Sequence, residues 1–202
     1  IYSLRILELL ESSIRKNILP ISKPVKIHVK LDTGMHRLGF MDDDLDELIR
    51  KLEANPMLYI QSVFSHLAAS EDPAQDAFTR KQIDTFRKMS NRIAKATEHP
   101  VLLHILNSAG ISRFPEAQFG MVRLGISLYG ITDVPEDQEK LEQVATLRST
   151  ISQIKTVRKG DSVGYNRSFT AKQATRIAIV PIGYADGLSR TLGNGRGTLI
   201  IN

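Results

Sequence analysis

Hydrophobic and polar residues alternate one by one along a short stretch near the start of the chain. The apolar members are Val25, Ile27, Val29 and Leu31, and the polar members between them are Lys26, His28 and Lys30. Successive side chains of a β-strand point to opposite faces, so this alternation predicts a strand over residues 25–31 with one apolar and one cationic face. If the apolar face packs under helices in a parallel barrel, Lys30 points into the barrel at the C-terminal end of its strand. Barrel enzymes have their active sites at these strand ends.

Helical and extended patterns alternate over the first two thirds of the chain. Helices are predicted at the start of the chain, from about residue 42 to 54 and from about 73 to 97. Strands are predicted over 25–31, 58–66, 101–106 and 120–123. The third helix is expected to turn inward its apolar stripe of Phe78, Ile83, Phe86, Met89 and Ile93. This order favours an α/β fold with a parallel sheet and crossover helices. Because such crossovers are right-handed, the four strand tips are expected on one face.

The pattern changes at about Leu141. Short strand-like segments follow, and Lys159-Gly160-Asp161 and Asn194-Gly195 between them have the turn chemistry of antiparallel sheets. We therefore expect one domain over residues 1–140 and the start of an all-β domain over 141–202.

Polar residues stand at each predicted strand tip of the first domain. They are Lys30, His66, Asn107 with Ser108, and Arg123. One such residue at a strand end is usually structural. Four tips on one face are better explained by a binding site, because α/β folds bind ligands in the loops beyond the carboxyl ends of their strands.

Composition narrows the possible functions. The 202 residues carry a net charge of +5, without a dense Lys/Arg tract interleaved with aromatic residues, which argues against nucleic acid. There is no cysteine, so disulfide and thiol chemistry are excluded. No apolar run approaches the ~20 residues of a membrane helix. We expect a cytoplasmic protein without a membrane or nucleic-acid partner. Because the chain opens on Ile1 and stops directly after a strand-like segment, both ends are expected to be cuts within a longer protein.

Six motifs, in this order, give the chain a family resemblance. They are DTGMHRLGF (32–40), FSHLAASED (64–72), LNSAG (106–110), VRLGISLYG (122–130), VGYNRSFTA (163–171) and IGYADGLSR (182–190). Together they resemble the alanine racemase family, pyridoxal 5′-phosphate enzymes with a TIM barrel followed by a β domain. The resemblance implies the second half of a (β/α)8 TIM barrel over 1–140, the start of the antiparallel β domain over 141–202, and a homodimer. It also implies an isomerase that racemises L-alanine to D-alanine for cell-wall peptidoglycan.

The resemblance assigns roles around the cofactor ring. Arg37 matches the arginine that bonds the cofactor's phenolic oxygen, and Lys30 matches the lysine, carbamylated in several members, that positions this arginine. Arg123 matches the arginine at the ring nitrogen, and His66 matches the histidine that supports it. A permanent positive charge beside that nitrogen disfavours its protonation, which suits racemisation because the carbanion is then only moderately delocalised.

The resemblance also assigns the phosphate site and an acid/base group. Ser108, with the backbone of Gly125 and Ile126, matches the phosphate cradle, and Asn107 matches a residue of the same pocket. Tyr165 matches the catalytic tyrosine, which the family contributes to the neighbouring subunit's active site. Inverting a carbon centre needs two acid/base groups on opposite faces, and Tyr165 can serve one. No metal is implied.

Lys30 has a physical reason to be modified. A lysine in a barrel interior near Arg37 suffers desolvation and like-charge repulsion, and carbamylation would reverse the sign of its charge. We therefore expect Lys30 to be carbamylated.

The chain also departs from the family. The cofactor-linking lysine of the first barrel strand and the methionine-aspartate pair of the late β domain have no counterpart, so the isolated chain is expected to be inactive. Leu124 replaces a common proline, and Glu71 replaces the usual aspartate of the substrate entryway.

Three alternatives stay open. Lys30 could itself form the Schiff base, as in barrel aldolases. A non-catalytic pyridoxal-phosphate carrier uses a similar barrel, although the segment after Leu141 and Tyr165 argue against it. Serine and broad-specificity racemases share the motifs, so the amino acid is not fixed by them.

Overall fold

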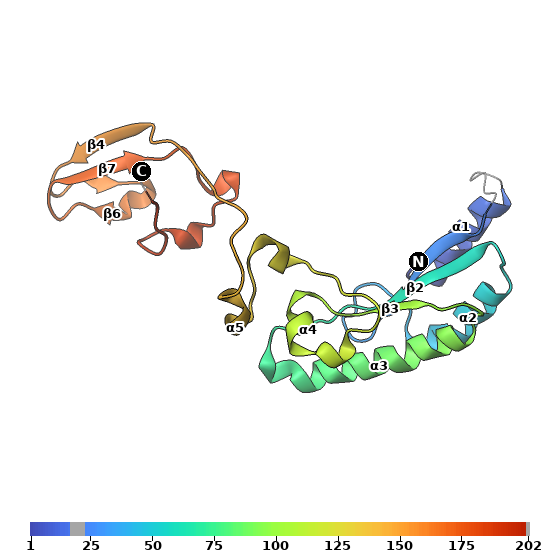
Figure 1. Ribbon diagram of the computed structural model, residues 1–202. Coiled ribbons are helices and arrows are strands. Elements are labelled where there is room, and N and C mark those ends of the chain that lie inside the picture. Colours follow the sequence, from blue (N-terminus) through green and yellow to red (C-terminus); the bar gives the residue numbers. More distant parts are fainter. Residues whose placement is uncertain (17–22, 201–202) are drawn as a thin grey trace. The chain divides into compact units, whose positions relative to one another are not determined.

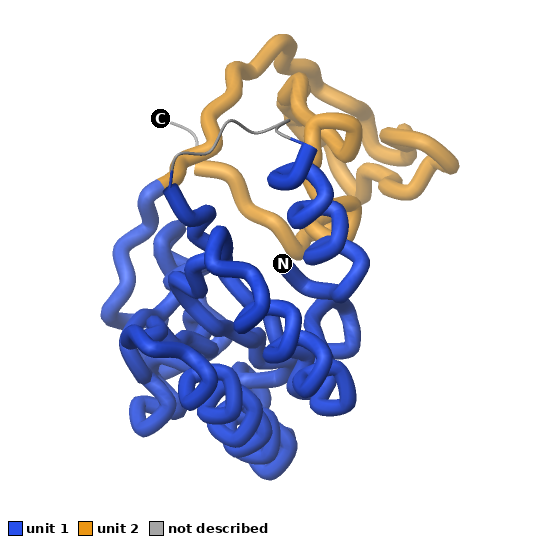
Figure 2. Tube along the Cα trace, turned by 90° about the vertical axis from the view of Figure 1, so that its right-hand side faces the viewer, with its two compact units in different colours: residues 1–144 blue, residues 145–202 orange. Residues whose placement is uncertain are grey.

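The computed structural model describes residues 1–16 and 23–200 (Figure 1). These residues form two compact units, Ile1–Val144 and Ala145–Asn202, coloured separately in Figure 2. The sequence pattern placed the change of character a few residues earlier, at Leu141.

Unit 1 is an α/β unit in which helices alternate with parallel strands. Its main elements are α1 (Leu4–Arg15), β1 (Val25–Lys30), η1 (Asp42–Asp44), α2 (Leu45–Glu53), β2 (Leu58–Phe64), η2 (Pro73–Gln75), α3 (Asp76–Lys95), β3 (Leu102–His104), α4 (Ser108–Arg113), η3 (Pro115–Ala117), η4 (Ile126–Tyr129) and α5 (Pro135–Gln138). The strands lie in the order β1-β2-β3, and both pairs are parallel. The predicted α/β class with a parallel sheet is confirmed.

The two faces of β1 follow the alternation in the sequence. Ile27 and Val29 are buried, whereas Lys26 and His28 are exposed. Lys30 is partly buried at the end of the strand, where it pairs in register with Phe64 of β2. The prediction of one apolar and one polar face is therefore confirmed.

Helices α2 and α3 cover the apolar face of this sheet (Figure 1). The buried residues of the two helices include Leu45, Leu48, Leu52, Ile83, Phe86, Met89 and Ile93. Phe78 was also expected to point inward, but it is 39% exposed. It lies in the first turn of α3, where its ring faces Gly34 of the loop after β1 and not the core.

The fourth predicted strand, residues 120–123, is absent as a regular strand from the described part of unit 1. The segment still runs beside β3, because Gly120 N donates to Leu103 O at 3.1 Å and Arg123 N donates to Leu106 O at 3.0 Å. Both bonds are donated from the same segment, and Phe119 just before it has a φ of 43°. These bonds hold Arg123 at the end of β3 without building a strand ladder.

The loop over residues 32–40 is closed tightly on the end of β1. Asp32 N donates to Phe40 O at 2.8 Å, and Phe40 N donates to Lys30 O at 2.9 Å. The Asp32 carboxylate accepts bonds from the backbone N–H of Gly34 and of His36, both at 3.0 Å. The closed loop carries Arg37 beside the tip of β1.

Replacing Gly39 with alanine is expected to destabilise unit 1 by several kcal/mol. Gly39 has a φ of +141°, and a Cβ atom there would lie 2.5 Å from Asp32 N and 2.6 Å from the Leu31 carbonyl carbon. Backbone strain and overpacking would each contribute roughly 1–3 kcal/mol. Urea unfolding of Gly39→Ala and of Gly34→Ala is the measurement.

Gly34 is the matched control because its φ of +134° is similar and its Cβ would meet side chains of Phe78 and Gln82 at 3.2 to 3.4 Å. Those side chains can move, so Gly34→Ala should lose about 1–3 kcal/mol from strain alone. Equal losses in the two variants would contradict a rigid closure at Gly39.

Unit 2 is built from short antiparallel pairs. Strand β4 (Gln153–Val157) pairs with β7 (Thr175–Ile179), and β5 (Ser162–Val163) pairs with β6 (Phe169–Thr170). The turns η5 (Tyr165–Arg167), η6 (Tyr184–Asp186) and η7 (Arg190–Leu192) lie between and after them. The predicted antiparallel pairing is confirmed, but the strand expected near the C-terminal end is not formed over 198–200, where Leu199 and Ile200 are 71% and 92% exposed.

Among the described residues, none of the helices combines the length and apolar composition that crossing a bilayer requires.

Candidate functional site

A pocket of about 340 Å³ lies at the strand tips of unit 1. Its lining includes six of the predicted site residues, namely His66, Asn107, Ser108, Arg123, Gly125 and Ile126. Glu71 and Leu124, the two departures noted in the sequence, also line it. A second hollow of about 420 Å³ lies between α2, α3 and the start of β2, and none of the predicted site residues lines it. The strand-tip pocket is therefore the candidate site.

Arg123 is held in this pocket by several acceptors. Its Nη2 donates to the carbonyl oxygens of Ser65 at 2.6 Å and Ile105 at 3.2 Å, and to His66 Nδ1 at 3.2 Å. Its Nη1 donates to His104 Nδ1. The guanidinium also lies 5.4 Å from the centre of the Phe64 ring. These contacts fix a permanently charged group at the strand tips.

Both histidines that touch Arg123 are held neutral. Burial, followed by the charges of Arg123, Arg37 and Lys30, lowers the pKa of His66. Burial, followed by Arg123 and His28, lowers the pKa of His104 to about 4. At neutral pH each imidazole ring can therefore accept a hydrogen bond from the arginine.

Ser108 and Asn107 begin helix α4 at the edge of the pocket. The Asn107 side chain caps the helix, because its Oδ1 accepts from Gly110 N at 3.0 Å and from Ser70 Oγ at 2.7 Å. Ser108 Oγ accepts from Gly125 N at 2.9 Å and thereby joins the helix start to the 124–127 segment. Among the described residues, the Ser108 hydroxyl hydrogen has no acceptor, whereas the Asn107 oxygen is occupied by structural bonds.

Lys30 and Arg37 belong to the same electrostatic neighbourhood. Burial lowers the pKa of Lys30 first, the charges of Arg37 and Arg123 lower it further, and the Asp32 carboxylate opposes them. Arg37 itself is exposed on the 32–40 loop. The charges of both Arg37 and Arg123 therefore act on the lysine at the tip of β1.

Tyr165 lies in unit 2, where it opens the η5 turn and 97% of it is exposed. Among the described residues, its hydroxyl makes no hydrogen bond. Tyr165 thus lies on the surface of its own unit.

Three residues of the site were missed from the sequence. Ser62, Ser65 and His104 are 0%, 1% and 4% exposed, and all contact Arg123 directly or through one another. Serines give no distinctive pattern. The signal for His104 was its place as the single polar residue within the apolar run 101–106.

The free energy of unfolding should fall as the pH drops from 6.5 through 4. In the unfolded chain His104 binds its proton with the ordinary pKa of 6.5, whereas in the fold it does so only near pH 4. Above pH 6.5 His104 is neutral in both states and does not lower the stability. Below pH 6.5 the unfolded chain binds this proton first, which lowers the free energy of unfolding by at most about 3 kcal/mol. Urea unfolding of the wild type and of His104→Asn at both ends of this range is the measurement. An identical pH dependence in the two proteins would contradict a depressed pKa.

Comparisons with known proteins agree along nearly the whole chain. A family model described as alanine racemase, N-terminal domain, matches residues 1–133, and one described as alanine racemase, C-terminal domain, matches 144–202. The alanine racemase of Treponema denticola is 38% identical over 176 residues, which are 85% of this chain and 46% of the relative. The alanine racemase of Cutibacterium acnes is 39% identical over 176 residues, which are 87% of this chain and 47% of the relative.

Solved structures give the same result. Alanine racemase from Streptomyces lavendulae superposes with a TM-score of 0.84 at 31% identity and covers 94% of this chain and 50% of its own. Alanine racemase from Bartonella henselae, solved with covalently bound pyridoxal phosphate, has a TM-score of 0.74 at 28% identity, covering 93% of this chain and 49% of its own. The chain thus spans about half the length of the relatives it matches.

Proposed function

Because this chain belongs to the alanine racemase family, we propose that it binds pyridoxal 5′-phosphate and takes part in converting L-alanine to D-alanine for peptidoglycan precursors. The observation that carries the proposal is the strand-tip pocket, which gathers Arg123, His66, Ser108 and Gly125 around one space of about 340 Å³. We further propose that β1, β2 and β3 are consecutive strands of a TIM barrel, with residues 1–140 in its second half and 141–202 in the β domain.

The pocket has the donors that the cofactor requires. A phosphate group needs hydrogen-bond donors, and the Ser108 hydroxyl and the Ile126 N–H have no acceptor among the residues that the structure describes. A pyridine nitrogen needs one donor, and Arg123 Nε–H is similarly unused within the described ranges. Gly125 keeps the approach open, because a Cβ there would meet only Ser108 Oγ, at 3.6 Å. The residues present therefore fit pyridoxal phosphate.

Bound pyridoxal phosphate would supply an electron sink that makes the α-proton of an amino acid removable. Arg123 would keep the ring nitrogen unprotonated, because a fixed positive charge repels an added proton. His66 would support Arg123, and Arg37 would bond the phenolic oxygen. The Ser108 hydroxyl and the Ile126 N–H would hold the phosphate, and Gly125 would allow its close approach.

Tyr165 would hold or return the α-proton on one face of the substrate. Its full exposure on unit 2 supports a role in a neighbouring subunit, and we propose a homodimer on this ground. The second face requires a base other than the residues assigned here.

Lys30 would carry a carbamate. Its lowered pKa raises the fraction of neutral amine, which is the form that reacts with CO₂. The product is an anion, so repulsion from Arg37 and Arg123 becomes attraction. Electron density for three extra atoms on Nζ, or a ¹³C signal after labelling with bicarbonate, would support this. An unmodified ammonium in both measurements would refute it.

The function is tested on the complete natural polypeptide that contains this sequence. Incubation with pyridoxal phosphate and L-alanine should yield an equal mixture of the two enantiomers, far faster than the free cofactor does. Cofactor binding without D-alanine would instead support the non-catalytic carrier. Borohydride trapping followed by peptide mapping checks the aldolase-like alternative, since labelling at Lys30 would favour it.

A further inference from the structure

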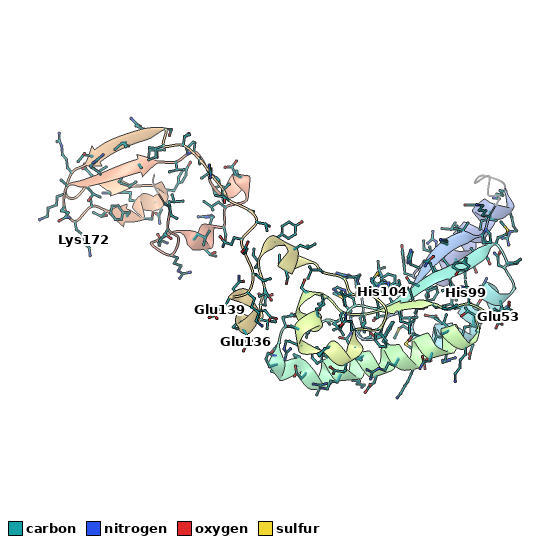
Figure 3. All side chains as sticks on the ribbon, in the orientation of Figure 1. Glu53, His99, His104, Glu136, Glu139 and Lys172 are labelled. Carbon is teal, nitrogen blue, oxygen red and sulfur yellow. The ribbon has the colours of Figure 1, made fainter. Side chains whose placement is uncertain are left out.

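A continuous chain of hydrogen bonds crosses the sheet and ends on Arg123. His28 of β1 lies 2.6 Å from Ser62 Oγ of β2 through its Nδ1. Ser62 Oγ lies 3.2 Å from His104 Nε2 of β3, and His104 Nδ1 bonds Arg123 Nη1. Each of the three strands contributes one member, and Figure 3 labels His104 at the end of β3.

The permanent charge of Arg123 sets the positions of the protons on His104. Arg123 is always a donor, so His104 Nδ1 must accept and carries no proton. The ring hydrogen of neutral His104 is then on Nε2 and is donated to Ser62 Oγ. The Ser62 hydroxyl accepts this bond and shares a second hydrogen bond with His28 Nδ1. The direction from Arg123 through His104 to Ser62 is thus set by the arginine.

Burial makes this arrangement hard to replace. Ser62 is 0% exposed and His104 is 4% exposed, so water has little access to either group. The His104 ring stacks on Phe64 at 5.1 Å with an interplanar angle of 3°, and the same Phe64 ring lies under Arg123. Rotation of His104 would break this stacking and leave buried polar atoms without partners, which is costly.

We propose that Ser62 and His104 are positioning residues that set the orientation of the Arg123 guanidinium. Ser62 accepts the Nε2–H of His104 and so holds the ring in place, and His104 then holds Arg123 Nη1. The consequence for catalysis rests on the function proposed above, but the tautomer and the arginine geometry do not. A purely structural histidine would fill space without needing a defined tautomer.

The first measurement is nitrogen-15 NMR of the complete polypeptide, labelled in histidine and arginine and studied without cofactor. His104 should show the Nε2–H tautomer and should not titrate above about pH 5. The Arg123 Nε–H resonance should be narrow and slow to exchange. In Ser62→Ala and His104→Leu this resonance should broaden and exchange faster, and His104→Asn, which can keep an acceptor near the Nδ1 position, should restore it in part.

His99→Leu is the matched control. His99 is also a stacked histidine of unit 1, 3.9 Å from the Tyr59 ring and 2.9 Å from Ile60 O through Nε2, and none of its described contacts leads to Arg123 (Figure 3). This variant should leave the Arg123 resonance unchanged. A doubly protonated or Nδ1–H form of His104, or an Arg123 resonance indifferent to Ser62→Ala and His104→Leu, would overturn the proposal.

The second measurement is steady-state kinetics with pyridoxal phosphate and alanine. Loss of a supporting partner should lower kcat about tenfold to a hundredfold with a smaller change in KM, by analogy with outer-shell partners of metal ligands. The absorption spectrum of the bound cofactor should shift in Ser62→Ala and not in His99→Leu. Kinetics and spectrum identical to the wild type in Ser62→Ala would overturn the positioning role. If the wild type forms no D-alanine, the proposed function fails, and the NMR result alone decides this inference.

Discussion

Replacing Arg123 with lysine should lower the rate of alanine racemisation by about a hundredfold or more and also destabilise unit 1. Lysine keeps the charge, but its single ammonium cannot reach the Ser65 and Ile105 carbonyls and the two histidine rings at once. Removing one preorganised charged donor from an active site lowers kcat by roughly 10²–10³. Each buried acceptor left without a donor lowers the free energy of unfolding by about 1–3 kcal/mol.

The measurements are racemisation kinetics and urea unfolding, with Arg80→Lys as the control. Arg80 is an exposed arginine of the same unit, in a surface ion pair with Glu116 at 2.7 Å, and such pairs contribute about 0–1 kcal/mol. Arg80→Lys should therefore change neither result appreciably. If Arg123→Lys behaved like Arg80→Lys, the fixed guanidinium would have no part in the site.

Replacing Tyr165 with phenylalanine should lower kcat by about 10²–10⁴, the usual contribution of a general acid or base, without changing thermal stability. The loss of rate follows from the proposed role of the hydroxyl in holding the α-proton. The unchanged stability follows from the structure of unit 2, in which Tyr165 is 97% exposed and contributes little packing to its own unit. Rates from L-alanine and from D-alanine and the thermal midpoint are the measurements.

Tyr184→Phe is the matched control for this variant. Tyr184 also lies in unit 2, is 70% exposed and opens the similar η6 turn, yet no catalytic role is assigned to it. Isotope exchange at Cα should distinguish the enantiomers in Tyr165→Phe, because one face loses its acid/base group. Equal activity in the two tyrosine variants would contradict the role of Tyr165.

The sequence predicted those features that have a local cause. The alternation at Val25 to Lys30 predicted a two-faced strand because a strand has a period of two residues. The rule that parallel strands emerge on one face predicted that Lys30, His66, Asn107 with Ser108, and Arg123 would meet. All of them except Lys30 line one pocket. The assignment of Tyr165 to a neighbouring subunit came from the family resemblance and stays a prediction.

The features that were missed or wrong depend on contacts between distant segments. Ser62 and His104 become partners only through the register of β2 against β3, which no local pattern encodes. The segment 120–123 has the composition of a strand, but pairing requires a continuous ladder and not extended backbone alone. Phe78 fits the apolar stripe of its helix, yet the turn it occupies lies beside Gly34 and beyond the core.

The decisive measurement is a crystal structure of the complete polypeptide with pyridoxal phosphate bound. We expect the phosphate to bind to Ser108 and the Ile126 N–H and the ring nitrogen to accept a hydrogen bond from Arg123 Nε. Cofactor bound away from the strand tips, for example in the hollow beside His99, would contradict it.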